Sequence, residues 1–192
     1  SAFDNEDVVN YEIGMKADFP DQRLSVNSSL FSYLYKDKQS IFLDPNTDSG
    51  IPQYVTSTSD VEAWGWDLQV YWNPVENLAF SLNSQYIDQT YKDFVTSGGT
   101  DLSGQATGLP EWSTTVGGSY TWVFGDNSSL EFSLLYAYMS AVTCNDDSQT
   151  QGTCQVSTSF DVGTATNRTD ARLQWTSAEG RWGASTRWMP TA

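Results

Sequence analysis

Residues 62–72 read EAWGWDLQVYW and, after the short turn NPVEN, residues 78–86 read LAFSLNSQY. In an extended chain, successive side chains point to opposite faces. One face of the first stretch then carries Trp64, Trp66, Leu68, Val70 and Trp72, and the other carries Ala63, Gly65, Asp67, Gln69 and Tyr71. The second stretch alternates in the same way. The pair therefore predicts two amphipathic β-strands joined as a hairpin.

Three further hairpins of this kind accompany it. The sequence predicts paired strands at 8–19 and 23–36, 62–72 and 78–91, 111–124 and 130–140, and 169–176 and 181–188. Gly, Pro, Asn or Asp lies in every short turn, as tight turns require. The other connections, 37–61, 92–110 and 141–168, are far longer than ordinary loops. Short turns at one end and long loops at the other are typical of an antiparallel transmembrane β-barrel with periplasmic turns and extracellular loops.

The second predicted strand does not reveal which of its faces is buried. Phe31, Tyr33 and Tyr35 occupy one phase, whereas Leu24, Val26, Leu30 and Leu34 occupy the other. Tyr and Trp prefer the membrane–water boundary, and here they gather near strand ends, at Tyr11, Trp72, Tyr91, Trp112, Trp122, Trp182 and Trp188. A water-soluble β-sandwich with core aromatics is an alternative, although a sandwich does not need all its long loops on one side.

The charge of the chain limits its partners. Nine basic and 24 acidic residues give a net charge of −15, which argues against binding nucleic acid. The same balance suits a strongly anionic ligand poorly unless basic residues outside this chain receive it. The lone carboxylates Asp67 and Glu131 are expected to face a polar barrel lumen.

The sequence offers no catalytic group and little for a metal. Without histidine there is no Ser-His or Cys-His pair, so we expect a non-enzyme without a cofactor. Asp44, Asn46 and Asp48 alternate as in a calcium loop, but the glycine comes one residue late and Val55 replaces the bidentate glutamate, which favours an ordinary turn. Cys144 and Cys154 lie in the longest loop, and in an oxidising compartment they are expected to form a local disulfide.

Several stretches together resemble the C-terminal part of the barrel of a TonB-dependent outer-membrane receptor. They are residues 10–19, 30–37, 72–74 with 77–78, 86–94, 109–113 and 171–173, which read NYEIGMKADF, LFSYLYKD, WNP with NL, YIDQTYKDF, LPEWS and ARL. Each is a loose pattern, but their order and spacing span nearly the whole chain.

The resemblance implies a receptor in the outer membrane of a Gram-negative bacterium, which imports a ferric siderophore, cobalamin or glycan through a 22-stranded barrel containing a plug. Its expected partners are outer-membrane lipid, the TonB complex through the plug, and the ligand. The 192 residues are then one segment of about eight strands without the plug, and by themselves not a competent transporter. A self-contained eight-stranded barrel, acting as an adhesin, structural protein or narrow pore, is the alternative, and a secreted binding module is a third. Ligand contacts are expected in the long loops, at the aromatic residues Phe42, Tyr54 and Phe160.

Overall fold

The computed structural model describes residues 5–44, 53–96, 99–145, 155–156 and 161–189. The main strands are β1 (Asp7–Phe19), β2 (Leu24–Asp44), β3 (Gln53–Val75), β4 (Leu78–Asp93), β5 (Trp112–Val123), β6 (Ser129–Met139), β9 (Thr166–Thr176) and β10 (Gly183–Trp188). A one-turn 3₁₀ helix, η1 (Pro20–Gln22), follows β1, and the two-residue strands β7 (Gln155–Val156) and β8 (Asp161–Val162) pair with each other. The fold is all-β apart from η1 in the part of the chain that is described.

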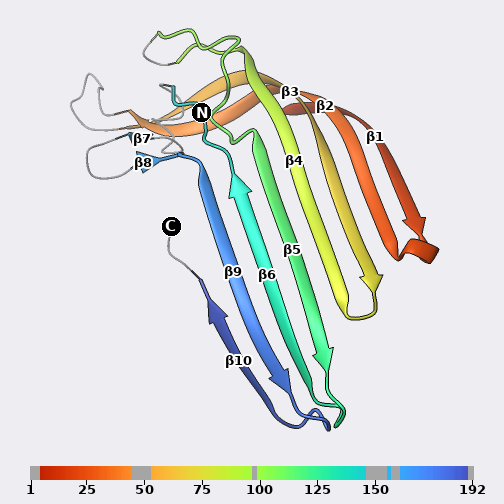
Figure 1. The fold of residues 1–192 in the computed structure, drawn as a ribbon. Coiled ribbons are helices and arrows are strands. Elements are labelled where there is room, and N and C mark those ends of the chain that lie inside the picture. Colours follow the sequence, from red (N-terminus) through yellow and green to blue (C-terminus); the bar gives the residue numbers. More distant parts are fainter. Residues whose placement is uncertain (1–4, 45–52, 97–98, 146–154, 157–160, 190–192) are drawn as a thin grey trace.

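The eight main strands form one antiparallel sheet in the order β1-β2-β3-β4-β5-β6-β9-β10. Figure 1 shows them side by side in a single curved layer, with the short turns β1–β2, β3–β4, β5–β6 and β9–β10 together along its right and lower margin. All four predicted hairpins are present. The second strand of each hairpin pairs with the first strand of the next hairpin along the chain. This meander confirms the predicted architecture and gives no support to a sandwich of two facing sheets.

The sheet is open along its two outer strands. Figure 1 places β1 and β10 at opposite margins, and neither pairs with the other among the described residues. The described strands therefore form part of a barrel wall and not the closed eight-stranded barrel of the alternative prediction. In the described part of the chain, no helix has the length and apolar character needed to cross a membrane.

The connection predicted at 37–61 is wrong in most of its length. β2 continues to Asp44 and β3 begins at Gln53, and the two pair from Lys38 with Ser59 to Asp44 with Gln53. A bulge between Tyr35 and Lys38 separates this extension from the rest of the hairpin, with Asp37 at φ 54°. The backbone N–H of Asp37 donates to Asp60 Oδ1 at 3.0 Å. Ser and Thr made these residues resemble a loop, but Thr, Val, Ile and aromatic residues favour extended chain when a neighbouring strand is present.

The short turns are closed by local hydrogen bonds. After η1, Arg23 adopts a left-handed φ of 50° and its N–H donates to the carbonyl of Pro20. In the β5–β6 turn, the N–H and hydroxyl of Ser128 donate to Asp126 Oδ1 at 2.9 and 2.6 Å. The Ser128 hydroxyl and then its N–H lower the pKa of the Asp126 carboxyl. Pro20 and Asp126, which helped to predict these turns, therefore accept hydrogen bonds that close them.

Candidate functional site

Backbone register assigns every strand residue to one of the two faces of the sheet. Leu30, Trp66, Tyr86 and Trp112 are successive register partners on β2 to β5 and share one face. The apolar face so defined contains Val9, Tyr11, Ile13, Met15, Leu24, Val26, Leu30, Leu34, Trp64, Trp66, Leu68, Val70, Trp72, Phe80, Leu82, Tyr86, Trp112, Val116, Trp122, Phe132, Leu134, Tyr136, Leu173 and Trp175. Most large hydrophobic residues that are exposed on the strands belong to it.

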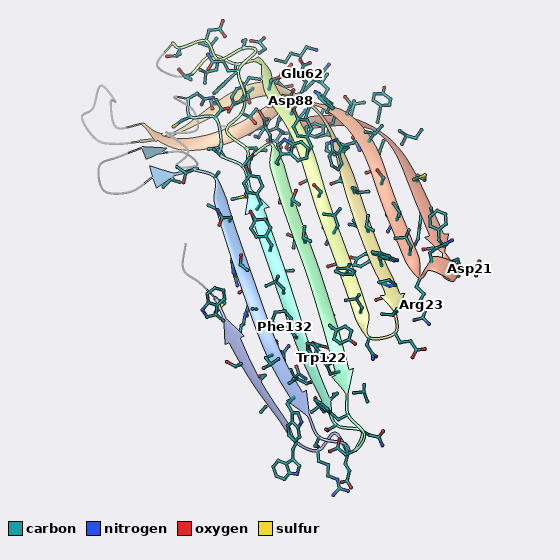
Figure 2. The ribbon with its side chains drawn as sticks, in the orientation of Figure 1. Asp21, Arg23, Glu62, Asp88, Trp122 and Phe132 are labelled. Carbon is teal, nitrogen blue, oxygen red and sulfur yellow. The ribbon has the colours of Figure 1, made fainter. Side chains whose placement is uncertain are left out.

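Aromatic rings form two rows on this apolar face. Near the long loops, Trp64 packs on Tyr86, Tyr86 on Trp112, and Trp112 on Trp66, with ring centroids 4.9 to 5.5 Å apart. The indole N–H of Trp64 donates to Asp88 Oδ2 at 3.2 Å. Figure 2 shows Asp88 at this loop end of the sheet. A row of amphipathic rings with polar groups beside it is what a membrane–water boundary favours.

The second aromatic row lies near the short turns. Trp72 stacks on Phe80 with centroids 5.7 Å apart, and Trp122 and Phe132 lie on the same face. Figure 2 shows Trp122 and Phe132 in the turn half of β5 and β6. On β3 and β4 the two rows are six to eight residues apart, or about 20 to 26 Å of strand. That spacing matches the height of the apolar band of an outer-membrane barrel.

The opposite, polar face carries mainly Ser, Thr, Asn, Gln and charged side chains. Asp67 and Glu131 lie on it by register, as the sequence predicted. Register also settles the second strand, because Phe31 is opposite Gly65 and Tyr35 is opposite Val61, which places Phe31, Tyr33 and Tyr35 on the polar face. The prediction that Tyr91 is a membrane-interface residue is wrong, since Tyr91 pairs with Val61 and lies on the polar face.

The loop end of the polar face is covered by the connection between β4 and β5, which we call the loop shelf (residues 94–96 and 99–111). Phe94 and Leu102 pack against Val61 and Tyr91, and all four side chains are at most 3% exposed. Tyr35 packs against this cluster at its edge. Because Val61, Tyr91 and Tyr35 belong to the polar face, the loop shelf folds over that face.

Backbone hydrogen bonds hold the loop shelf to β4. Gly104 N–H donates to the carbonyl of Tyr91 at 2.7 Å, and Tyr91 N–H donates to that of Gln105 at 2.9 Å. Thr107 N–H donates to the Gln89 carbonyl at 3.1 Å. The shelf thus stays attached to β4 along its length.

Side chains extend this attachment to β2 and to the segment after β6. The hydroxyl of Thr107 donates to Gln89 Oε1 at 2.5 Å, and the amide of Gln89 donates to the hydroxyl of Tyr33. The side-chain amide of Asn145 donates to the carbonyl of Ala106 at 2.8 Å. The loop shelf is therefore fixed to β2, to β4 and to the segment after β6 at the loop end of the sheet.

Glu6, which directly precedes β1, is hydrogen-bonded to β2 near the loop shelf. Tyr35 Oη donates to Glu6 Oε2 at 2.5 Å, and the N–H of Gln39 donates to Glu6 Oε1 at 2.8 Å. The Tyr35 hydroxyl and then the Gln39 N–H lower the pKa of the Glu6 carboxyl below its usual range. Glu6 therefore ties the start of β1 to the upper part of β2.

Two of the three residues predicted to bind ligand lie on described strands. The backbone of Phe42 pairs with Val55 and that of Tyr54 pairs with Leu43 in the extension of the β2–β3 hairpin. Phe160 lies outside the described residues. The side chains of Phe42 and Tyr54 likewise lie outside the described part of the structure, so the role of all three residues stays a prediction.

The predicted disulfide and calcium loop fall largely outside the described residues as well. Cys144 is not a free thiol, whereas Cys154 is not among the described residues, so their pairing stays a prediction. Asp44 ends β2, but Asn46 and Asp48 are also outside the described part. Among described residues, no group of His, Cys, Asp or Glu is placed to hold a metal ion.

Sequence reasoning did not predict that the loop shelf packs on the polar face. Gln89, Phe94, Leu102 and Thr107 have no motif, and their roles follow from contacts between the loop shelf and strands remote in sequence. One signal was available, since a loop carrying Phe94 and Leu102 amid Gly, Ser and Thr has apolar residues to bury.

Comparisons with known proteins agree with this geometry. The model of the family described as TonB dependent receptor-like, beta-barrel, matches residues 1–190. Among solved structures, the chain is similar to BauA, the ferric preacinetobactin receptor from Acinetobacter baumannii, with 18% identity and a TM-score of 0.61 over 94% of this chain and 24% of that one. No curated protein sequence matches. The chain thus spans about a quarter of the length of that receptor, and it belongs to the TonB-dependent receptor β-barrel family.

Proposed function

We propose that this chain forms part of the barrel wall of a receptor in the outer membrane of a Gram-negative bacterium, which imports a small ligand with energy supplied through TonB. The observation that carries the proposal is the two-faced sheet. Its apolar face has two aromatic rows at the spacing of a membrane, and its polar face is covered at the loop end by an ordered ledge. The chain is a non-enzyme in this proposal, because its role is to enclose and guide a ligand.

A ferric siderophore is the first ligand to test. One solved structure that resembles this wall is that of a ferric siderophore receptor, and its 18% identity supports the fold and not the ligand. Cobalamin and a glycan are the other candidate ligands. The TonB complex would act on the plug region of the whole receptor and not on this wall.

Uptake of labelled ligand by the source bacterium tests the proposal. Cells that lack the parent gene are compared with cells that carry it and with cells that lack TonB, using radiolabelled ferric siderophores of catecholate and hydroxamate type, cobalamin and oligosaccharides. We expect one ligand whose uptake needs both the parent gene and TonB. If uptake of every ligand is the same in all three strains, the proposal is wrong.

Alanine substitutions in the full-length parent test the predicted loop contacts at Phe42, Tyr54 and Phe160. Replacing an aromatic residue that stacks on the ligand should raise the ligand concentration needed for half-maximal uptake by about tenfold, equivalent to about 1.4 kcal/mol. Phe124→Ala is the matched control, because Phe124 is an exposed aromatic residue in the turn at the other end of the sheet. Unchanged uptake in all three variants would remove these residues from the binding site.

A further inference from the structure

The first two short turns of the sheet are joined into one surface. Arg23 follows η1 with a left-handed φ of 50°, and its carbonyl accepts from the N–H of Asn73 at 3.0 Å. Its guanidinium lies 3.7 Å from Glu76 Oε1, in the turn between β3 and β4. The β1–β2 turn and the β3–β4 turn are therefore held side by side through Arg23.

A groove of about 550 Å³ lies at these turns, and we call it the turn groove. Its lining residues include Asp21, Arg23, Trp72, Val75 and Glu76. Figure 2 shows Asp21 and Arg23 at the turn end of the sheet. Trp72 belongs to the apolar face and to the aromatic row near the short turns. The turn groove therefore lies where the apolar band of the wall meets water.

The turn groove is formed by neighbouring strands of this chain. β1 pairs with β2 and β2 pairs with β3, so no further strand of a longer receptor can lie between the two turns. Further strands would extend the wall beyond β1 or β10. A plug would fill the barrel on the polar face, whereas Trp72 lies on the opposite face. The rest of a receptor would therefore leave this groove open to lipid.

The turn groove carries charges of both signs. Among the described residues that line it, Arg23 is basic, and Asp21 and Glu76 are acidic. The side chains of Arg23 and Glu76 are 48% and 85% exposed, so their long ion pair holds neither group firmly. A guanidinium has five N–H donors and suits a phosphate. The two carboxylates beside it would repel a purely anionic headgroup and attract an ammonium group.

We propose that the turn groove binds the headgroup of a zwitterionic phospholipid that carries a primary ammonium group. The lipid phosphate accepts from the Arg23 guanidinium, and the ammonium group donates to the carboxylates of Asp21 and Glu76. The upper part of the acyl chains lies against Trp72 and its register partner Leu24, both on the apolar face. The wall thus selects one class of lipid at its turn-side boundary.

The inference rests on the membrane placement in the proposed function and not on import of a ligand. A receptor that imports none of the tested ligands can still bind this lipid, and a receptor that imports one can fail to bind it. Uptake and lipid binding are therefore separate outcomes.

Native mass spectrometry of the purified full-length receptor tests the site. Phosphatidylethanolamine, phosphatidylcholine and phosphatidylglycerol with identical acyl chains are titrated separately. We expect phosphatidylethanolamine to bind most tightly. Phosphatidylcholine has the same phosphate but no N–H on its nitrogen, and phosphatidylglycerol has no cation for the two carboxylates.

Two arginine variants show whether the preferred lipid binds at this groove. Arg23→Gln should weaken phosphatidylethanolamine binding by about threefold to fivefold, since the side chain is partly exposed. Arg181→Gln is the matched control, because Arg181 lies in the β9–β10 turn and is paired with Glu179 at 3.0 Å. Its affinity for the lipid should be unchanged.

A variant of the two carboxylates distinguishes recognition of the headgroup from a loss of folding. Asp21→Asn combined with Glu76→Gln should weaken binding of phosphatidylethanolamine and strengthen binding of phosphatidylglycerol, because the repulsion of an anionic headgroup is removed. A misfolded protein would weaken both.

Crosslinking of the unaltered receptor gives a result that needs no variant. Phosphatidylethanolamine with a photoreactive group near the start of one acyl chain should attach mainly to peptides that contain residues 19–24 or 72–78. Equal attachment at all four short turns would overturn the proposal. Equal affinity for phosphatidylethanolamine and phosphatidylglycerol would also overturn it, as would an Arg23→Gln variant that binds phosphatidylethanolamine like the wild type.

Discussion

Two regions of the polar face differ in whether another segment of the chain covers them. Over β2 to β4, the chain covers the face with its own loop shelf, and Val61 and Leu102 are 0% and 2% exposed. Over β9 and β10, no described segment covers the face, and among the described residues Arg172, which lies opposite Arg187, has no ion pair. The first region is covered by apolar contacts inside the chain, whereas the second carries charged side chains that the described residues leave uncovered.

The difference follows from what each connection contains. The loop shelf has Phe94 and Leu102 to bury, and Gly99, Gly104 and Gly108 adopt positive φ where the loop reverses direction. The β9–β10 connection is a short turn, so it cannot fold back over the sheet.

Filling the packed region should have the largest effect on the molecule. A Cβ at Gly65 would lie 2.3 Å from the carbonyl oxygen of Tyr86 and 2.6 Å from Cζ of Phe31. The Phe31 ring could swing away, but the backbone carbonyl cannot. Gly65→Ala should therefore lower the free energy of unfolding by about 3 kcal/mol, at the upper end for overpacked sites, measured by urea unfolding in lipid vesicles.

Gly14→Ala on β1 is the matched control for this change. Its Cβ would meet the Ser28 carbonyl oxygen at 3.5 Å, an ordinary contact, so the free energy of unfolding should change by less than about 0.5 kcal/mol. Phe31→Ala combined with Gly65→Ala should recover only part of the loss, since the contact with Tyr86 remains. Equal stability of the two alanine variants would show that β3 and β4 are not held as closely as described.

How far the sequence predicts this fold depends on the range of the interactions concerned. Trp64 to Trp72 and Leu78 to Tyr86 alternate locally, so their faces could be predicted from the hairpin alone. The phase of β2 could not, because Leu30 and Phe31 are both apolar and only pairing with Trp66 and Gly65 on β3 decides between them. The extension of β2 and β3 was missed for the same reason, since Ser and Thr become strand residues only beside a partner.

The candidate sites divide in the same way. Leu102 packs on Val61, which lies 41 positions earlier in the chain, and no local sequence pattern predicts this contact. By contrast, Arg172 and Arg187 belong to one predicted hairpin, and the short turn between 169–176 and 181–188 fixes their register. That pair could have been found from the sequence by carrying the hairpin prediction through to its residue pairs.

Releasing the loop shelf should have the next largest effect, confined to one region. Leu102→Ala removes a buried side chain from the cluster with Val61, Tyr91 and Phe94, which should cost about 2 kcal/mol, the low end for such sites, because a loop can relax around the cavity. We expect the amides of Leu102 and Gln105 to exchange with deuterium about 30-fold faster or more, measured by mass spectrometry. Val95→Ala on the same loop, where Val95 is 55% exposed, should leave exchange unchanged.

The two regions should respond independently to this change. Leu102→Ala should leave deuterium exchange at Arg172 and Arg187 unchanged, because none of the residues in the cluster lies on β9 or β10. Faster exchange on β9 and β10 in Leu102→Ala would mean that these strands and the loop shelf open as one unit, and the contrast between the two regions would then be wrong.

The smallest expected effect is a dependence on pH at the edge of the packed region. Because the pKa of Glu6 lies below its usual value of 4.5, its bonds to Tyr35 and Gln39 are intact above that value and are lost as pH falls through the lowered pKa. The amide signal of isotope-labelled Gln39 should therefore shift at a pH below 4.5. In Tyr35→Phe the midpoint should rise toward 4.5 without reaching it, since the Gln39 N–H still donates to Glu6. The same midpoint in both proteins would show that the Tyr35 hydroxyl does not hold Glu6, and the packed region would then end at Val61.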